Sequence, residues 1–347
     1  MRVILYYTFK FFIKTGLFFY SKKIKINGSQ NIPKDGAVLF TANHPNGLID
    51  PILIATHIKR KTHFLVRAAV FKKPIVAYFF DLLGMMPVYR IRDGIKQLSK
   101  NEAIFNKCEQ LLSKNKTLLI FPEGSHNRKR SIRPLSKGFT RIIFQTLDKH
   151  PKTKLYIVPV GITYQNSSKY PSKIALSFGI PIETNSYMKE VNRFEVTKSL
   201  KKEVLEQLKQ LTVHIPDDAN YEENLANLNN ANVDFTEIQK VNSLDYTNKI
   251  KDNSKSTFNY LKPLFFLVIL NSFIPYILWK IASKKVDEIE FLDTFRFGFN
   301  IVLFPLFYIF QSLIINYIFN KEIAIIYLTF SFLIILTYAK LSPTNAE

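Results

Sequence analysis

The chain has 347 residues, a formal net charge of +21 and 47% hydrophobic residues, among them 31 Phe and 17 Tyr. This length suits one large domain with an appendage, and the charge favours membrane surfaces, phosphate-bearing substrates or nucleic acid as partners. The single cysteine, Cys108, excludes an internal disulfide framework and a metal site built from several cysteines.

The positive charge is concentrated before the last quarter of the chain. From Leu261 onward, seven Lys or Arg residues stand against six Asp or Glu residues, so almost all of the excess lies before this point. The composition therefore predicts a basic body followed by a nearly neutral, hydrophobic tail.

The first predicted element is an apolar, aromatic helix over residues 3–20, interrupted by Lys10 and Lys14. A lysine at the bilayer centre costs about 2.5–3.5 kcal/mol, so residues 1–23 are expected to lie in the membrane interface instead of crossing the bilayer. A core helix of the main domain is the alternative. The run lacks a small-residue cleavage site, so no signal peptide is expected.

Two predicted strands follow, at residues 24–26 and 37–40, and the second runs into the turn formers at 43–47. Asp50 then opens a helical segment. His44 thus lies just after a predicted strand, and Asp50 lies at the start of the predicted helix that follows. Its imidazole could take a proton from a hydroxyl while the carboxylate fixes the tautomer, although a turn histidine with a capping aspartate fits the same pattern.

The middle of the chain alternates strands and helices. Short strands are predicted at residues 63–67, 117–121, 155–160 and 174–178, and helices at 71–83, 95–112 and 138–147. Such alternation predicts an α/β fold with a mixed β-sheet flanked by helices.

Two segments of this region carry candidate binding residues. The extended segment 84–90 ends at Arg90. This arginine is either a solvent-exposed surface charge or a phosphate-binding residue, since a guanidinium group can bind phosphate through two hydrogen bonds. The basic loop 121–138 follows a buried strand and has Glu123 as its one acid. In α/β folds this position lies at the carboxyl edge of the sheet, where ligands bind, and Gly124 lets a ligand approach the backbone.

Four sequence blocks occur in order: NHPNGLIDP at 43–51, GMMPVYR at 84–90, FPEGS at 121–125 and IVPVGITY at 157–164. Their order and spacing resemble the glycerophospholipid acyltransferase family, which includes glycerol-3-phosphate and lysophosphatidate acyltransferases. Five residues separate His44 from Asp50, whereas the commonest first block of the family has four; the longer spacing is similar to a glycerol-3-phosphate acyltransferase subgroup. His126 stands where many members carry arginine.

The resemblance implies a role for each matching residue. His44 is implied as the general base and Asp50 as the partner that orients it. The implied substrate-binding residues are Arg67, Arg90, Glu123, Gly124, Ser125 and Lys137. No metal and no cofactor is implied, because acyl transfer from a thioester needs only a deprotonated alcohol.

The rest of the chain divides by composition. Residues 24–216 are predicted as the catalytic domain, ending in an amphipathic helix over 186–212. The Asn-rich segment 217–260 is predicted as a polar linker that could carry short helices. Residues 261–347 are predicted as a membrane-embedded helical tail with three hydrophobic stretches, at 264–279, 295–319 and 323–339.

The sequence thus predicts an acyltransferase of phospholipid biosynthesis. It would move a fatty acyl group from acyl-CoA or acyl carrier protein to the hydroxyl of glycerol 3-phosphate or lysophosphatidate. It would sit on membrane lipids with its catalytic domain facing the cytoplasm. Another lysophospholipid acceptor is the first alternative, and a membrane-anchored basic binding protein without catalysis is the second. Nucleic acid is not an expected partner. A nucleic-acid binder would have aromatic residues scattered among basic ones and no ordered catalytic blocks, and this sequence shows the opposite.

Overall fold

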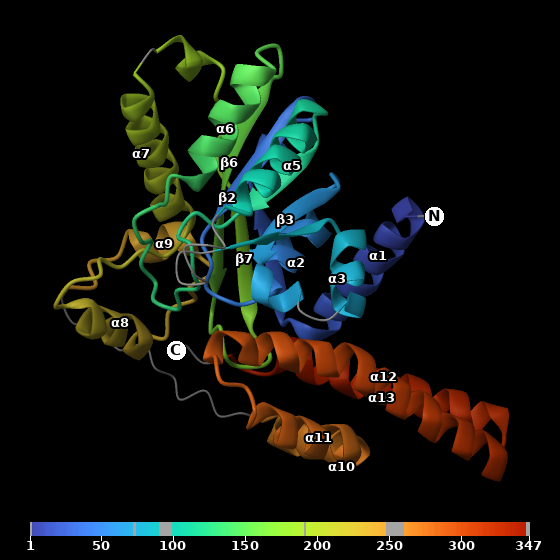
Figure 1. Cartoon of the computed structure of the whole chain (residues 1–347). Helices are drawn as coiled ribbons and strands as arrows, with labels where there is room; N and C mark the ends of the chain where they lie inside the picture. Colours follow the sequence, from blue (N-terminus) through green and yellow to red (C-terminus); the bar gives the residue numbers. More distant parts are fainter. Residues whose placement is uncertain (1, 72–73, 90–98, 191, 248–259, 345–347) are drawn as a thin grey trace.

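The computed structural model describes residues 2–71, 74–89, 99–190, 192–247 and 260–344. Its centre is a mixed sheet with the strand order β1-β7-β6-β2-β5-β3-β4, to which β8 adds by pairing with β6 (Figure 1). The strands of this described part are β1 (Lys23–Asn27), β2 (Ala37–Ala42), β3 (Thr62–Arg67), β4 (Met85–Val88), β5 (Thr117–Ile120), β6 (Leu155–Tyr164), β7 (Lys173–Phe178) and β8 (Ile182–Glu183). The predicted α/β class with a mixed sheet is confirmed.

Five neighbouring strands run in the same direction. β2 pairs in parallel with β5 and β6, and β3 pairs in parallel with β4 and β5. All six residues of β2 are buried, as expected for a central strand covered on both faces. The carboxyl ends of these five strands therefore meet at one edge of the sheet, whereas β7 runs antiparallel to β6.

Helices cover both faces of the sheet (Figure 1). On one face, Ala37 and Leu39 of β2 pack in a core with side chains from α5 (Asn101–Ser113), α6 (Gly138–Lys149) and α7 (Arg193–Leu211). On the other face, Val38 and Phe40 pack with α2 (Ile49–His57) and with Leu17 near the end of α1 (Arg2–Tyr20). The alternation of buried side chains along one strand thus builds two separate hydrophobic cores.

Helix α1 buries one side and exposes the other. Leu17 is buried in the core, whereas Ile4 and Phe11 are among its exposed side chains. Exposed apolar side chains on a helix that also packs against the domain are compatible with a position in the membrane interface. Contact of residues 1–23 with lipid stays a prediction.

The expected polar linker, 217–260, carries two short helices in its described part, α8 (Tyr221–Asn230) and α9 (Ile238–Asn242). Leu228 and Phe235 are fully buried in a small core that also contains Ala175 of β7. This part of the chain is therefore packed onto the sheet, unlike a linker. Its few large apolar residues are spaced so that each reaches the same small core, which average composition does not reveal.

The hydrophobic tail forms α10 (Lys262–Asn271), α11 (Phe273–Ser283), α12 (Leu292–Ile318) and α13 (Lys321–Leu341). In the described part of the chain, α12 with its preceding turn (Ile289–Ile318) and α13 are each long and apolar enough to cross a membrane. They run side by side away from the sheet (Figure 1). Helices α10 and α11 pass the same test only as a pair, and they are bent by 95° at their junction. The predicted C-terminal helical region that could enter a membrane is confirmed.

Candidate active site

The candidate site lies where β2 and β5 end. Thr41, one residue before the end of β2, lies opposite Ile120 of β5 and Pro159 of β6, so the loops after β2 and β5 start side by side. Asn43 fixes the first of these loops, because its side chain donates to Ile162 O at 2.9 Å and accepts from Ile162 N at 2.7 Å. The next residue along this anchored turn is His44.

His44 and Asp50 form a hydrogen-bonded pair. His44 Nδ1 lies 2.7 Å from Asp50 Oδ2, and the carboxylate belongs to the first turn of α2. The backbone N–H of Asn46 donates to the same oxygen at 2.7 Å, and the Tyr164 hydroxyl donates to Asp50 Oδ1 at 2.8 Å. The strand-turn-helix arrangement thus brings together the two residues that the first sequence block predicts.

The Asp50 carboxyl is completely buried, and burial raises its pKa well above the ordinary value. The hydrogen bonds from Asn46 and Tyr164 act in the opposite direction and lower this pKa. The pKa of Tyr164 is itself raised well above its ordinary value by burial, so its hydroxyl is a donor at neutral pH. When Asp50 is ionised, its Oδ2 also accepts from Nδ1 of His44. This assigns the ring proton to Nδ1 and leaves Nε2 as the basic nitrogen.

Aromatic side chains hold the His44 ring in place. Its ring stacks on Phe121 with the centroids 3.8 Å apart and the planes inclined by 12°. His126 packs against it at 4.1 Å and 60°, and in turn meets the Phe291 ring edge-on. The ring is thus fixed by a hydrogen bond at Nδ1 and by stacking on its face, which directs Nε2 away from Asp50.

Glu123 lies under the same loop, with its side chain only 2% exposed. Its Oε2 accepts from Arg133 Nε at 3.1 Å, and the carboxylate also accepts from the backbone N–H of His44. Burial raises the pKa of Glu123, and the hydrogen bonds and charge of Arg133 lower it. Arg133 also donates to the Ser125 hydroxyl at 3.1 Å, so one guanidinium ties two predicted binding residues together.

The other predicted binding residues surround this loop at different depths. Gly124 has a φ of +79° and faces open space, since a Cβ built there meets no atom within 4 Å. Lys137 is exposed at the start of α6, and its ammonium group has no partner among the residues that the structure describes. Arg67 ends β3 and forms an ion pair with Glu288 at 3.4 Å. Arg90 lies outside the described residues, so its predicted role stays a prediction.

The start of α12 covers the turn that carries His44. Gly47 N donates to Glu290 O at 3.1 Å, and Asn46 Nδ2 donates to Asp293 Oδ2 at 3.0 Å. The Tyr20 hydroxyl of α1 donates to the other oxygen of the buried Asp293. A chain of hydrogen bonds therefore runs from α1 and α12 through Asn46 to Asp50.

Sequence reasoning did not single out four residues of this site: Phe121, Arg133, Tyr164 and Asp293. Tyr164 closes the fourth sequence block, and Phe121 opens the third, so their place in the blocks was the available signal. Asp293 is acidic at the edge of an apolar run, a pattern that is typical of a buried, partnered carboxylate as well as of a solvated helix end.

Comparison with known proteins agrees with the sequence blocks. Residues 23–163 match the model of the Acyltransferase family. Glycerol-3-phosphate O-acyltransferase 1 of Saccharomyces cerevisiae is 20% identical over 47% of this chain and 32% of its own length. The 1-acyl-sn-glycerol-3-phosphate acyltransferase of Borreliella burgdorferi is 22% identical over 58% of this chain and 78% of its own length.

The chain spans only 32% to 42% of the length of the three fungal relatives that it matches. Among solved structures, a 1-acyl-sn-glycerophosphate acyltransferase, PlsC, from Thermotoga maritima aligns with a TM-score of 0.44 and 21% identity. That alignment covers 60% of this chain and 81% of the other.

Proposed function

We propose that this chain, whose residues 23–163 form an acyltransferase-family domain, transfers a fatty acyl group from an acyl thioester to a hydroxyl of a phosphorylated glycerolipid precursor. The observation that carries the proposal is the His44–Asp50 pair at 2.7 Å, placed at the carboxyl edge of the sheet beside the Glu123 loop. The sequence blocks and the matched relatives support the same chemistry.

The pair supplies the proton transfer that the reaction needs. Nε2 of His44 takes the proton of the acceptor hydroxyl while its oxygen attacks the thioester carbonyl. The tetrahedral intermediate then expels the thiolate, which receives that proton from the imidazolium. The carboxylate of Asp50 holds the tautomer and stabilises the positive ring. An ester and a thiol result, with no covalent enzyme intermediate and no cofactor beyond the acyl thioester.

The acceptor in this proposal carries a phosphate monoester. Such a group has nearly two negative charges at neutral pH, and a positively charged loop favours it over a choline-capped head group. The Lys137 ammonium is exposed at the start of α6, and Arg67 ends β3, which pairs in parallel with β4. The resemblance implies Arg90 as a further phosphate contact. Glycerol 3-phosphate is the first acceptor proposed because of the five-residue spacing between His44 and Asp50, and lysophosphatidate is the second.

Glu123, Gly124 and Ser125 have a different role in this proposal. Arg133 holds the carboxylate of Glu123 and the hydroxyl of Ser125, so these side chains shape the loop. The open space at Gly124 leaves room for the acceptor beside the backbone. The catalytic domain faces the cytoplasm, where acyl-CoA and acyl carrier protein are found, and membrane lipids surround α12 and α13.

The test uses the purified full-length chain in nanodiscs with acyl-CoA or acyl carrier protein as donor. Glycerol 3-phosphate, lysophosphatidate and lysophosphatidylcholine serve as acceptors. We expect turnover with the two phosphomonoesters, a loss of at least about 100-fold for His44→Ala, and a smaller loss for Asp50→Asn. His150→Ala is the matched control, because this histidine bonds Glu109 on the α5–α6 side of the sheet.

A His44→Ala variant that keeps more than about a tenth of the turnover would contradict the general-base role. Equal or faster turnover with lysophosphatidylcholine would contradict the proposed phosphomonoester acceptor, but it would not affect the role proposed for His44 and Asp50.

A further inference from the structure

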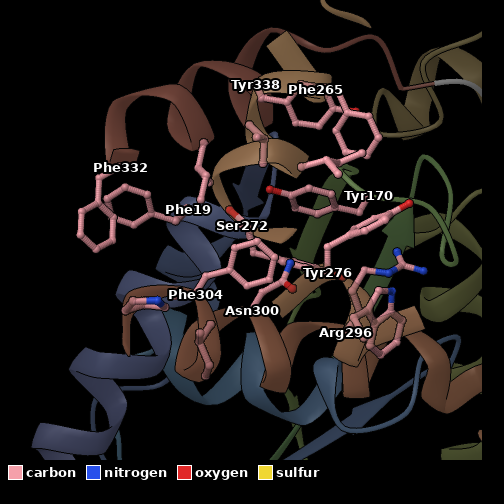
Figure 2. Close-up of a pocket in the computed structure, with 18 of the residues that line it drawn as sticks. Phe19, Tyr170, Phe265, Ser272, Tyr276, Arg296, Asn300, Phe304, Phe332 and Tyr338 are labelled. Carbon is pink, nitrogen blue, oxygen red and sulfur yellow. The ribbon is translucent and has the colours of Figure 1, made fainter. Parts of the chain in front are cut away.

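A second site lies outside the segment that matches the family. A cavity of about 560 Å³ opens between α1, the bent pair α10–α11, α12 and α13 (Figure 2). None of the described residues that line it falls within residues 23–163. The cavity is therefore formed by the helical tail, by α1 and by residues 168–170 of the loop between β6 and β7.

The walls of the cavity are rich in aromatic side chains. Phe19, Phe265, Phe304, Phe332 and Tyr338 point into it (Figure 2). Several of these side chains belong to α12 and α13, the two helices that are long and apolar enough to cross a membrane. The walls thus suit a hydrocarbon chain.

Hydrogen bonds hold the cavity open at the bend between α10 and α11. Ser272, at the bend, bonds the hydroxyl of Tyr308 on α12, and Asn271 donates to Ser331 on α13 at 3.0 Å. Tyr327 of α13 adds a further bond to Asn271 at 2.9 Å. These side-chain bonds tie the bend to α12 and α13, and the backbone at the bend is bonded separately, by Ser272 N to Ile269 O at 3.2 Å and by Tyr276 N to Ser272 O at 2.9 Å. The bend is therefore held by contacts on both neighbouring helices, and the cavity beside it is preformed.

One end of the cavity is cationic. Arg296, Lys280 and Lys169 line it there, and Arg296 donates to Ser168 O at 2.8 Å and lies over the Trp279 ring. Asp293 forms an ion pair with Arg296 at 3.4 Å and offsets one of these three positive charges, so this end of the cavity keeps a net positive charge. A cationic end next to an aromatic chamber is complementary to a molecule with one anionic head group and one apolar chain.

We propose that this cavity binds a single-chain anionic amphiphile, with its phosphate or carboxylate at Arg296 and Lys280 and its chain among the aromatic side chains. The volume lies within the range of about 300–1,000 Å³ that is typical of sites for drug-sized ligands. That size suits one chain with its head group. The proposal does not depend on the acyl transfer proposed above.

The test uses hexadecyl phosphate with a photoreactive diazirine in its chain. This probe has no hydroxyl to accept an acyl group, so it is not turned over. After irradiation of the full-length chain in phosphatidylcholine nanodiscs, mass spectrometry locates the label. We expect label on peptides from α10 to α13, with at least about tenfold less label from the matching hexadecanol probe.

Two pairs of variants sharpen the test. Ile335→Trp fills the cavity and should reduce the label at least about fivefold, whereas Leu333→Trp, exposed on the same helix and outside the lining, should not change it. Lys280→Gln should weaken binding about two- to fivefold, as expected for an exposed charge pair, and Lys284→Gln, outside the lining, should not.

Label found only on peptides covering residues 43–51 or 121–138, and displaced by glycerol 3-phosphate, would overturn the proposal in favour of binding at the candidate active site. Equal labelling of Ile335→Trp and the unaltered chain would also overturn it. Equal labelling by the phosphate and alcohol probes would overturn the role given to Arg296 and Lys280.

Discussion

The Tyr164→Phe substitution tests how Asp50 is kept ionised. The phenol donates to Asp50 Oδ1 at 2.8 Å inside a fully buried site, where burial already raises the pKa of the carboxyl well above its ordinary value. Phenylalanine keeps the ring and removes only this donor. The carboxylate then retains the bonds from Asn46 and His44, so the substitution isolates one hydrogen bond to a buried charge.

The size of the effect follows from that bond. A hydrogen bond to a charged group contributes about 1.5–3 kcal/mol, and one pKa unit corresponds to about 1.4 kcal/mol. Since the Tyr164 bond lowers the pKa of Asp50, its loss raises this pKa further. In the proposed mechanism, activity requires the ionised carboxylate of Asp50, so activity falls as pH decreases through this pKa. The acid limb of the pH–rate profile therefore moves to higher pH.

The assay is kcat/KM for acyl transfer measured from about pH 5 to 9 with a saturating thioester donor. Tyr156→Phe is the control, because Tyr156 is near the other end of β6, opposite Glu183 and far from the pair. We expect the control to superimpose on the unaltered chain. If the Tyr164→Phe profile also superimposes, the hydrogen bond does not set the ionisation of the pair and the reasoning fails.

Three further predictions concern the surroundings of the pair. Gly47→Ala places a Cβ 2.7 Å from Thr294 Oγ1, so thermal unfolding should show a loss of about 1–3 kcal/mol together with reduced turnover, whereas Gly298→Ala, with open space around it, should leave both unchanged. Lys137→Gln should raise the KM for the phosphomonoester acceptor several-fold and leave the KM for the donor unchanged, while Lys152→Gln should change neither. Full-length protein should stay in the membrane fraction after washing with high salt and with carbonate, and release by carbonate would exclude membrane-crossing helices.

The parts of the site that could be predicted from the sequence are local ones. His44 and Glu123 each follow a run of apolar residues that ends in turn formers, and such a run predicts a buried strand whose exit is fixed by neighbours in sequence. The alternation of strands and helices then predicts parallel strands with their carboxyl ends at one edge. Both residues are found at that edge.

The parts that could not be predicted depend on contacts between distant residues. Tyr164 reaches Asp50 across 114 positions, and Asn46 reaches Asp293 across 247. Neither contact leaves a periodic pattern in the sequence, because each is set by strand order and by the way α12 crosses the turn. The packed segment around Phe235 was hidden for a related reason, since a few spaced apolar residues in an Asn-rich stretch do not change its average composition.

The position of α12 links membrane attachment to the geometry of the candidate pair. The turn just before it supplies Glu290 O to Gly47 N. Its first turn supplies the Thr294 hydroxyl to Leu48 N at 3.0 Å, and Asp293 accepts from the Asn46 side chain. Asn46 in turn donates its backbone N–H to Asp50 at 2.7 Å. The turn between His44 and Asp50 is thus supported by a helix that lies outside residues 23–163 and is apolar enough to cross a bilayer. Because these bonds require α12 to be in place, a bilayer that orients α12 also helps to position the carboxylate that orients His44.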